Sequence, residues 1–182
     1  MTRKELLRKL SSAEIPFVVV GGTALSLYNS PRVTYDIDLS VRLIDVDKIV
    51  HLLYNHRFYL VEAVQEISCS ITLTARDALD WIEKEKAGSA SFVKIRSKPG
   101  PAPEVLHRDI IAGSQIDILF ELSIPFPRLL EHARTIQLDD YSFKVASPED
   151  LISLKKTRTD FSAADEEDIR FLEGLETENT RE

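Results

Sequence analysis

Apolar and polar residues recur along this chain with two different periods. Helical spacing is clearest near the N-terminus, where Leu6, Leu7 and Leu10 fall on one face. Short apolar or alternating runs, such as residues 17–20, indicate strands instead. The predicted helices cover residues 4–10, 24–28, 46–54, 74–86, 125–133, 151–157 and 163–175. The predicted strands cover residues 17–20, 36–41, 58–61, 92–96 and 116–122, followed by a hairpin over 136–145.

Residues that begin or end secondary structure fix several of these boundaries. Thr74 is expected to cap the helix over residues 74–86, and Gly88 is expected to end it. The hairpin is predicted to turn at Asp139-Asp140. The sequence Ser147-Pro148-Glu149-Asp150 has a capping serine, a first-turn proline and acids at the positive end of the helix dipole. It is therefore a strong helix start.

The irregular alternation of strands and helices favours an α/β or α+β fold with a mixed sheet. A length of 182 residues indicates one domain, with a core over about 14–146 and C-terminal helices over about 147–176. Residues 62–73 fit neither period, and three prolines predict a loop over residues 98–103. The polar tail after Glu176 is expected to fray.

Composition narrows the class of protein. The chain is 43% hydrophobic and 29% charged, which is typical of a soluble globular protein. Its single cysteine, Cys69, cannot form an intramolecular disulfide, and this predicts a cytoplasmic location. Neither a signal peptide nor a membrane-spanning run is recognisable, so no membrane partner is expected. The net charge of −7 argues against non-specific capture of nucleic acid, but a local basic groove stays open.

Three aspartates stand in otherwise apolar strands. Asp36 and Asp38 are expected on one strand face with Ser40, with Cα atoms ~6–7 Å apart. Their charges would repel each other, and a divalent cation would reverse that interaction. Asp117 repeats the pattern between two isoleucines. If the two strands are neighbours, the three carboxylates converge as a two-metal phosphoryl or nucleotidyl transfer site requires.

A glycine pair precedes these acids. Gly21, Gly22 and Thr23 lie at a predicted strand-to-helix turn. Glycines let backbone N–H groups approach phosphate oxygens, and a helix N-terminus favours negative charge. Each signal alone has an ordinary explanation, since an Asp-x-Asp is most often a solvated edge and a Gly-Gly pair most often a turn. Their order and register together favour a catalytic site.

The segment "VVVGGTALSLYNSPRVTYDIDLSV" resembles the signature of the nucleotidyltransferase superfamily that includes DNA polymerase beta. In the same way, "SQIDILFEL" resembles the strand of its third carboxylate. "VASPEDLISLKKTRTDFSAADEEDIRFL" resembles the closing helices of small bacterial members, of the abortive-infection or toxin–antitoxin type. The resemblance implies a nucleotidyltransferase fold, with a mixed sheet flanked by helices and C-terminal helices after it.

The resemblance also implies roles for individual residues. Asp36 and Asp38 would bind two Mg²⁺ ions, with Mn²⁺ as an alternative. Asp117 would complete one metal site and help to deprotonate an acceptor hydroxyl. The donor would be an NTP, whose triphosphate the turn at Gly21, Gly22 and Thr23 would hold. The acceptors of resembling groups include small molecules such as antibiotics, tRNA ends and protein side chains, and some members act with a cognate toxin or antitoxin partner.

Two cations are further candidates for phosphate contacts. Arg32 stands where similar proteins often carry an arginine or lysine, although a surface arginine is nearly as good an explanation. Lys155 is favoured over Lys156 because the resembling motif places a lysine four residues after the helix leucine, with dipole-compensating lysines as the alternative. Asp168 is expected to pair with a lysine or arginine. Ordinary roles are expected for four histidines, His51, His56, His107 and His132.

Two classes of function follow from these patterns. The first is a Mg²⁺-dependent enzyme that moves an NMP from an NTP to an acceptor hydroxyl and releases pyrophosphate. The second is a catalytically weak module of the same fold that acts as a toxin–antitoxin or defence-system partner. The complete set of Asp36, Asp38 and Asp117 favours catalysis, because a module that only binds could lose any of them.

Overall fold

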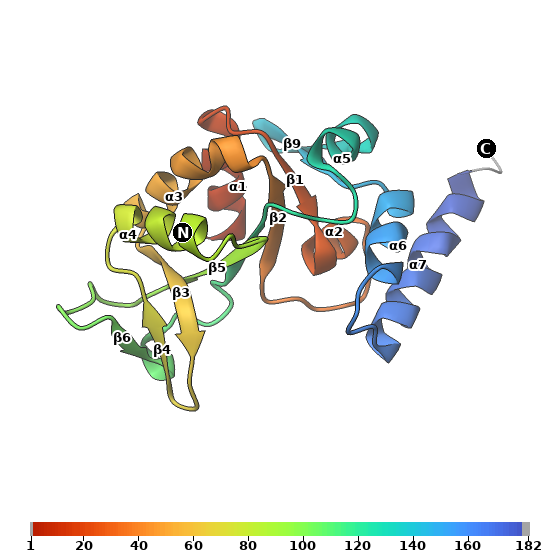
Figure 1. The fold of residues 1–182 in the computed structure, drawn as a ribbon. Coiled ribbons are helices and arrows are strands. Elements are labelled where there is room, and N and C mark those ends of the chain that lie inside the picture. Colours follow the sequence, from red (N-terminus) through yellow and green to blue (C-terminus); the bar gives the residue numbers. More distant parts are fainter. Residues whose placement is uncertain (1, 180–182) are drawn as a thin grey trace.

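The structure, a computed structural model, describes residues 2–179 of the chain. In this part a nine-stranded mixed sheet runs through the molecule in the order β6-β4-β3-β5-β7-β2-β1-β9-β8, with helices packed against it (Figure 1). The helices are α1 (Arg3–Ser12), α2 (Gly21–Leu27), α3 (Val46–Asn55), α4 (Ala75–Lys84), α5 (Phe126–His132), α6 (Pro148–Lys156) and α7 (Ala163–Asn179). Two single turns of 3-10 helix are η1 (Leu43–Asp45) and η2 (His107–Asp109).

The strands are β1 (Phe17–Val20), β2 (Ile37–Val41), β3 (Phe58–Val64), β4 (Ser68–Ile71), β5 (Ser89–Lys94), β6 (Glu104–Leu106), β7 (Ile116–Leu119), β8 (Arg134–Leu138) and β9 (Tyr141–Val145). Two neighbouring pairs are parallel, β1 with β9 and β2 with β7, and the others are antiparallel. The expected mixed sheet is therefore confirmed. Strand β2 lies between β1 and β7, so its side chains stand near the middle of the sheet.

The core forms where the apolar periodicity predicts it. Leu6, Leu7 and Leu10 of α1 are almost fully buried, and so are all four residues of β1. A second, smaller apolar cluster is formed by residues of β3, β4 and β6 together with Ile95, and it includes Cys69. Burial raises the pKa of the Cys69 thiol, as expected for a cysteine that serves as a small apolar residue rather than a nucleophile.

The capping residues act as the sequence indicates. The Thr74 hydroxyl accepts a hydrogen bond from the Asp77 backbone N–H at 3.1 Å. The Ser147 hydroxyl accepts one from the Asp150 N–H, also at 3.1 Å. The β8–β9 hairpin turns at the predicted place, and Asp139 takes the left-handed conformation there with φ of 53°. These local signals suffice because each one is satisfied within a few residues of the chain.

The ends of α4 and β7 differ from the prediction. Gly88 does not end α4: the helix ends at Lys84, and Lys86 adopts the left-handed conformation with φ of 47°. The Gly88 carbonyl instead accepts hydrogen bonds from the N–H groups of Phe120 and Glu121, at 2.8 and 3.0 Å. These two residues therefore leave the β7 ladder, and the strand ends at Leu119 rather than at residue 122. Tertiary hydrogen bonds override the local pattern at both places.

The segment over residues 62–73 and the C-terminus are also more regular than expected. Strand β3 continues to Val64 and turns back into β4, with a Gln65 N–H to Ser68 carbonyl hydrogen bond of 2.8 Å. Helix α7 runs to Asn179 and packs against α6 at one end of the molecule (Figure 1). Residues 180–182 of the tail expected to fray lie outside the described residues. In the described part of the chain, no helix has the length and apolarity needed to cross a membrane.

Candidate active site

One row of residues runs across four neighbouring strands at the centre of the sheet. Val20 of β1 pairs with Asp38 of β2, Asp38 pairs with Asp117 of β7, and Asp117 pairs with Ser91 of β5. The glycine turn begins directly after Val20. The register of the sheet thus places this turn, two aspartates and a serine hydroxyl side by side, although they are far apart in the sequence.

Asp36 joins this group from outside the strand. It precedes β2, which begins at Ile37, so the expectation that it shares a strand face with Asp38 is wrong. Its carboxylate is nevertheless positioned, because the Thr34 hydroxyl donates to Oδ1 and the Thr23 hydroxyl donates to the Asp36 carbonyl at 2.7 Å. One carboxylate oxygen from each of Asp36, Asp38 and Asp117 lies within 4.8 Å of the others. This cluster could hold a metal ion.

Electrostatic repulsion within the cluster is concentrated on Asp38. Burial, together with the negative charges of Asp36 and Asp117, raises the pKa of Asp38 to about 7. A backbone N–H of Gly22 donates to this carboxylate and opposes the shift. Near neutral pH the site thus holds more negative charge than it can stabilise alone. A bound cation would remove that cost.

The two glycines are required by close contacts as well as by conformation. Gly21 has φ of +59°, and a Cβ there would lie 2.0 Å from Oδ2 of Asp38. A Cβ on Gly22 would lie 2.9 Å from the Thr34 hydroxyl. Helix α2 begins at Gly21 itself, three residues earlier than predicted. Gly21 therefore lets the start of α2 pack directly against the Asp38 carboxylate, and Gly22 lets it pack against Thr34.

Gly21→Ala should destabilise the fold by about 1–3 kcal/mol. The left-handed conformation is unfavourable for alanine, and the added Cβ must also displace the Asp38 side chain. Chemical denaturation of the purified variant measures this loss. Gly100→Ala is the matched control, because a Cβ at that glycine meets nothing within 4 Å. Equal unfolding midpoints for the two variants would contradict this account of Gly21.

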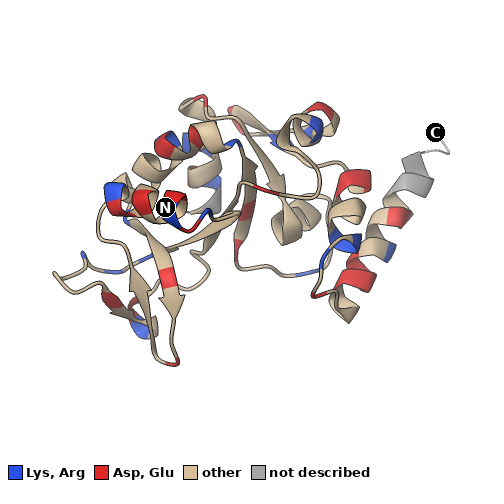
Figure 2. Ribbon diagram, viewed as in Figure 1, with Lys and Arg blue, Asp and Glu red and all other residues tan. Residues whose placement is uncertain are grey.

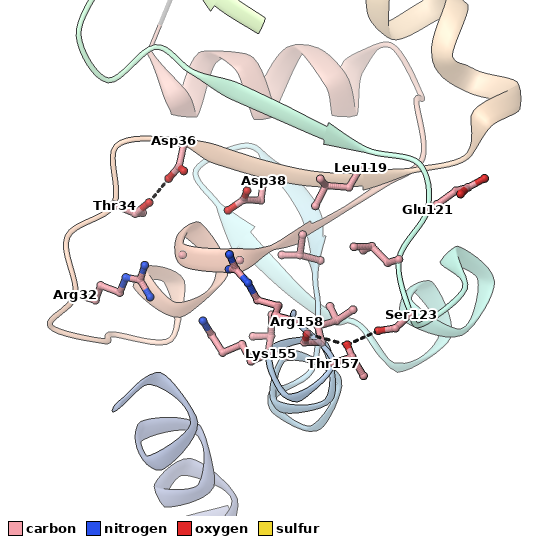
Figure 3. A pocket seen from close by; sticks show the side chains of 16 residues that line it. Arg32, Thr34, Asp36, Asp38, Leu119, Glu121, Ser123, Lys155, Thr157 and Arg158 are labelled. Atoms are coloured by element: carbon pink, nitrogen blue, oxygen red, sulfur yellow. Dashed lines mark hydrogen bonds between the residues drawn. The ribbon is translucent and has the colours of Figure 1, made fainter. Parts of the chain in front are cut away.

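A cavity of about 490 Å³ opens beside the glycine turn and the carboxylates. Figure 3 shows Asp36 and Asp38 along one wall and three cationic side chains across from them. Arg32 comes from the loop before β2, Lys155 from α6 and Arg158 from the segment after α6. Glycine N–H groups, carboxylates and cations around one cavity are the combination that binds a metal–polyphosphate ligand.

Acidic residues of α7 hold these cations in place. Lys155 is only 6% exposed, and its Nζ lies 3.0 Å from Oδ1 of Asp165 and 2.7 Å from Oδ2 of Asp168. Asp168 also pairs with Arg32, which confirms its expected role as a partner of basic residues. Figure 2 shows the basic residues of α6 next to acidic residues of α7. The α7 carboxylates thus compensate charges that would otherwise be costly to bury.

Asp165→Asn should destabilise the protein near neutral pH by about 2 kcal/mol. Burial opposes ionisation of this carboxyl, but hydrogen bonds from Ser162 and Lys155 outweigh it and lower the pKa of Asp165 to about 2. A lowered pKa stabilises the fold above the unfolded value of 3.8, and this contribution is lost as the pH falls through about 2. Urea denaturation at a series of pH values should therefore show the variant and wild type converging in acid. A constant difference would refute the assigned cause.

Further side chains surround the carboxylates and the cavity. The Thr23 side chain is buried, and its hydroxyl donates a hydrogen bond to the Asp36 carbonyl. A contact between the backbone N–H of Thr23 and a phosphate stays a prediction. Arg158 also lines the cavity, and the sequence indicates it only through its spacing of three residues, about one helical turn, from Lys155. Ser91 and Gln115 donate to Asp117, and no sequence signal indicated them. Among the histidines, His132 Nδ1 lies 3.3 Å from Oδ2 of the buried Asp150, an ordinary structural contact.

A mixed sheet that gathers three carboxylates beside a glycine turn and a cationic cavity is typical of nucleotidyl transfer enzymes. Residues 5–158 match the family described as nucleotidyl transferase AbiEii toxin, type IV toxin–antitoxin system. The chain belongs to this family, and it is an enzyme of the nucleotidyltransferase class. The resemblance inferred from the sequence is thereby confirmed. Helix α7, which supplies Asp165 and Asp168, lies outside the matched residues.

Two solved structures show a more distant likeness. Lincosamide antibiotic adenylyltransferase LnuA, determined with lincomycin bound, is 13% identical, with 95% of this chain and 97% of that chain covered and a TM-score of 0.49. A Thermotoga maritima protein described as a nucleotidyltransferase is 16% identical, with 84% of each chain covered and a TM-score of 0.45. No curated protein sequence matches the chain.

Proposed function

We propose that this protein is a Mg²⁺-dependent nucleotidyltransferase that moves an NMP from an NTP to an acceptor hydroxyl and releases pyrophosphate. The observation that carries the proposal is the convergence of Asp36, Asp38 and Asp117 within 4.8 Å beside the cationic cavity. Their residue types suit the role, because an all-carboxylate set of oxygen donors is the kind that Mg²⁺ or Mn²⁺ prefers. The raised pKa of Asp38 supports it further, since the nearby charge of Arg158 only partly offsets burial and the repulsion from Asp36 and Asp117.

Each group has a definite task in this scheme. Asp36, Asp38 and Asp117 would hold two metal ions, which when bound supply charge neutralisation at the reacting phosphate. Backbone N–H groups at Gly21, Gly22 and Thr23 would bind the triphosphate, with Arg32, Lys155 and Arg158 as its cationic partners. Asp117 would accept the proton of the acceptor hydroxyl. The hydroxyl oxygen then attacks the α-phosphorus in line with the departing pyrophosphate.

A labelling experiment tests the reaction type. Purified protein is incubated with Mg²⁺, lysate of its own host and one NTP at a time, labelled with ³²P at either the α or the γ position. Transfer of an NMP predicts product labelled only from the α position, together with release of pyrophosphate. Label arriving from the γ position would indicate a kinase-like transfer, and label from neither would count against catalysis.

The family description also supports a biological role as the toxin of a toxin–antitoxin pair, with a cognate antitoxin as partner. Expression of the wild type in a host that lacks the partner should arrest growth, and the partner should restore it. The variant Asp38→Asn distinguishes a toxin that acts by nucleotidyl transfer from a catalytically weak module that acts by binding. If toxicity comes from transfer, the variant is harmless, whereas a module that acts only by binding would stay toxic. A cytoplasmic location, expected from the composition, stays a prediction.

A further inference from the structure

A second cavity reaches the carboxylate cluster at Asp36. It has a volume of about 540 Å³, within the usual range for small-molecule sites. Thr34 and Asp36 line both cavities, so the second begins where the first ends. Asp38 and the glycine turn line only the first cavity. The carboxylate cluster therefore stands at the boundary between a space suited to the nucleotide and a separate space.

The Asp117 carboxylate accepts hydrogen bonds from residues that line the second cavity. The Ser91 hydroxyl donates to Oδ1 of Asp117 at 2.6 Å, and the Gln115 amide lies 3.1 Å from both of its oxygens. Ser91 and Gln115 both line the second cavity. The residue assigned to proton transfer is thus held by groups that belong to this space. In-line attack requires the acceptor hydroxyl to approach the α-phosphorus from the side opposite the departing pyrophosphate, and the second cavity gives such a hydroxyl a place of its own next to Asp36.

The walls of the second cavity are largely apolar. Three apolar or aromatic residues form part of its edge and are 70%, 72% and 74% exposed: Val33, Tyr35 and Val64. Contact of these side chains with water is unfavourable, and a bound apolar ligand would remove that contact. Val64 belongs to the β3–β4 hairpin, which carries few charged residues in Figure 2. Among the described residues that line the cavity, none is Lys or Arg. Such a lining lacks the Lys and Arg charges that supply most of the affinity of a protein for the phosphates of a nucleic acid.

We propose that the second cavity is the acceptor site, and that the acceptor is a small molecule with an apolar body and a hydroxyl group. This inference rests on the proposed function and adds the class of substrate. The acceptor oxygen forms a bond to the α-phosphorus, and the bond from that phosphorus to the pyrophosphate oxygen breaks. The hydroxyl proton passes to the Asp117 carboxylate and on to solvent. The product is the nucleotide ester of the apolar molecule.

Binding to the cavity can be tested without any turnover. Isotope-labelled protein is titrated with naphthol, a probe with an apolar ring body and one hydroxyl, and amide shifts are followed by NMR. We expect saturable shifts at residues that line the second cavity, including Val33, Val64 and Ala112. Val64→Glu places a charge at the cavity edge and should weaken this binding about tenfold or more. Ile67→Glu is the matched control, since Ile67 is 69% exposed on the same hairpin and does not line the cavity.

Turnover identifies the acceptor class. Host lysate is separated into small-molecule, RNA and protein fractions, and each is incubated with α-labelled NTP and Mg²⁺. The inference predicts label in the small-molecule fraction, reduced about tenfold or more by Val64→Glu and unchanged by Ile67→Glu. Label confined to RNA or protein, or naphthol shifts that avoid the cavity, would overturn the inference and leave the proposed function intact. Label in no fraction would overturn the proposed function, and the inference with it.

Discussion

Asp38→Asn is expected to abolish nucleotidyl transfer, with a loss of at least about a thousand-fold in kcat/KM, or ~4 kcal/mol of transition-state stabilisation. Asp38 is the central member of the carboxylate cluster, because the register of β2 places it between the glycine turn and Asp117. An amide keeps the shape of the side chain but removes the negative charge that a cation requires. The α-labelling assay measures the loss directly. A variant with wild-type turnover would disprove the assigned role.

The same substitution should raise stability in alkaline, metal-free buffer. The pKa of Asp38 is raised from 3.8 to about 7 in the folded protein, so the fold favours its neutral form. The associated stability is complete below pH 3.8 and is lost as the pH rises through about 7. Asparagine imitates the neutral form at every pH. Its stability should therefore equal that of the wild type near pH 4 and exceed it by roughly 2–4 kcal/mol at pH 8.

Chemical denaturation of wild type and Asp38→Asn in EDTA, at pH 4 and pH 8, measures this difference in stability. The same measurement is then repeated with Mg²⁺. A cation that binds the folded state should stabilise the wild type at pH 8 and have much less effect on the variant. Asp47→Asn serves as the control, because Asp47 has a side chain 67% exposed on α3. If Asp38→Asn were destabilising at pH 8 without metal, mutual repulsion among the three carboxylates would be the wrong account of this site.

Arg158→Gln should raise the KM for the NTP about ten- to a hundredfold, as expected for a charge-assisted contact worth about 1.5–3 kcal/mol. Arg158 lines the nucleotide cavity, and in Figure 3 its side chain extends from the segment after α6 towards Asp38. Its guanidinium is bonded to Asp160 at 3.0 and 2.8 Å, which orients it without burying it. Because the side chain is half exposed, the substitution should cost little stability. Initial rates over a range of NTP concentrations measure the effect.

Lys156→Gln is the matched control for Arg158. Lys156 ends the same helix, but its Nζ lies 3.6 Å from Glu173 of α7, and the residue does not line the cavity. Removing this charge should leave the KM within about twofold of wild type, since an exposed ion pair contributes little. Arg158→Lys should recover part of the loss by keeping the charge without the bidentate geometry. Equal KM values for Arg158→Gln and Lys156→Gln would indicate that Arg158 does not contact the nucleotide.

The sequence by itself determined the features that depend on near neighbours in the chain. Strand β1, the hairpin at Asp139 and the caps at Thr74 and Ser147 all form where local chemistry predicts them. The three aspartates also stood out, because a carboxylate inside an apolar strand is costly wherever that strand lies. Their order relative to the glycine pair was enough to indicate the class of enzyme.

Only the tertiary structure decided how these parts meet. The parallel pairing of β2 with β7 brings Asp117 beside Asp38, and no local pattern specifies which strands become neighbours. Asp36 shows the same limit, since a turn held by Thr34 and Thr23, rather than strand alternation, aims its carboxylate. The cation network of α6 and α7 and the two adjoining cavities likewise depend on distant segments. Burial and charge pairing are properties of the packed molecule, so they emerge only when the chain has folded.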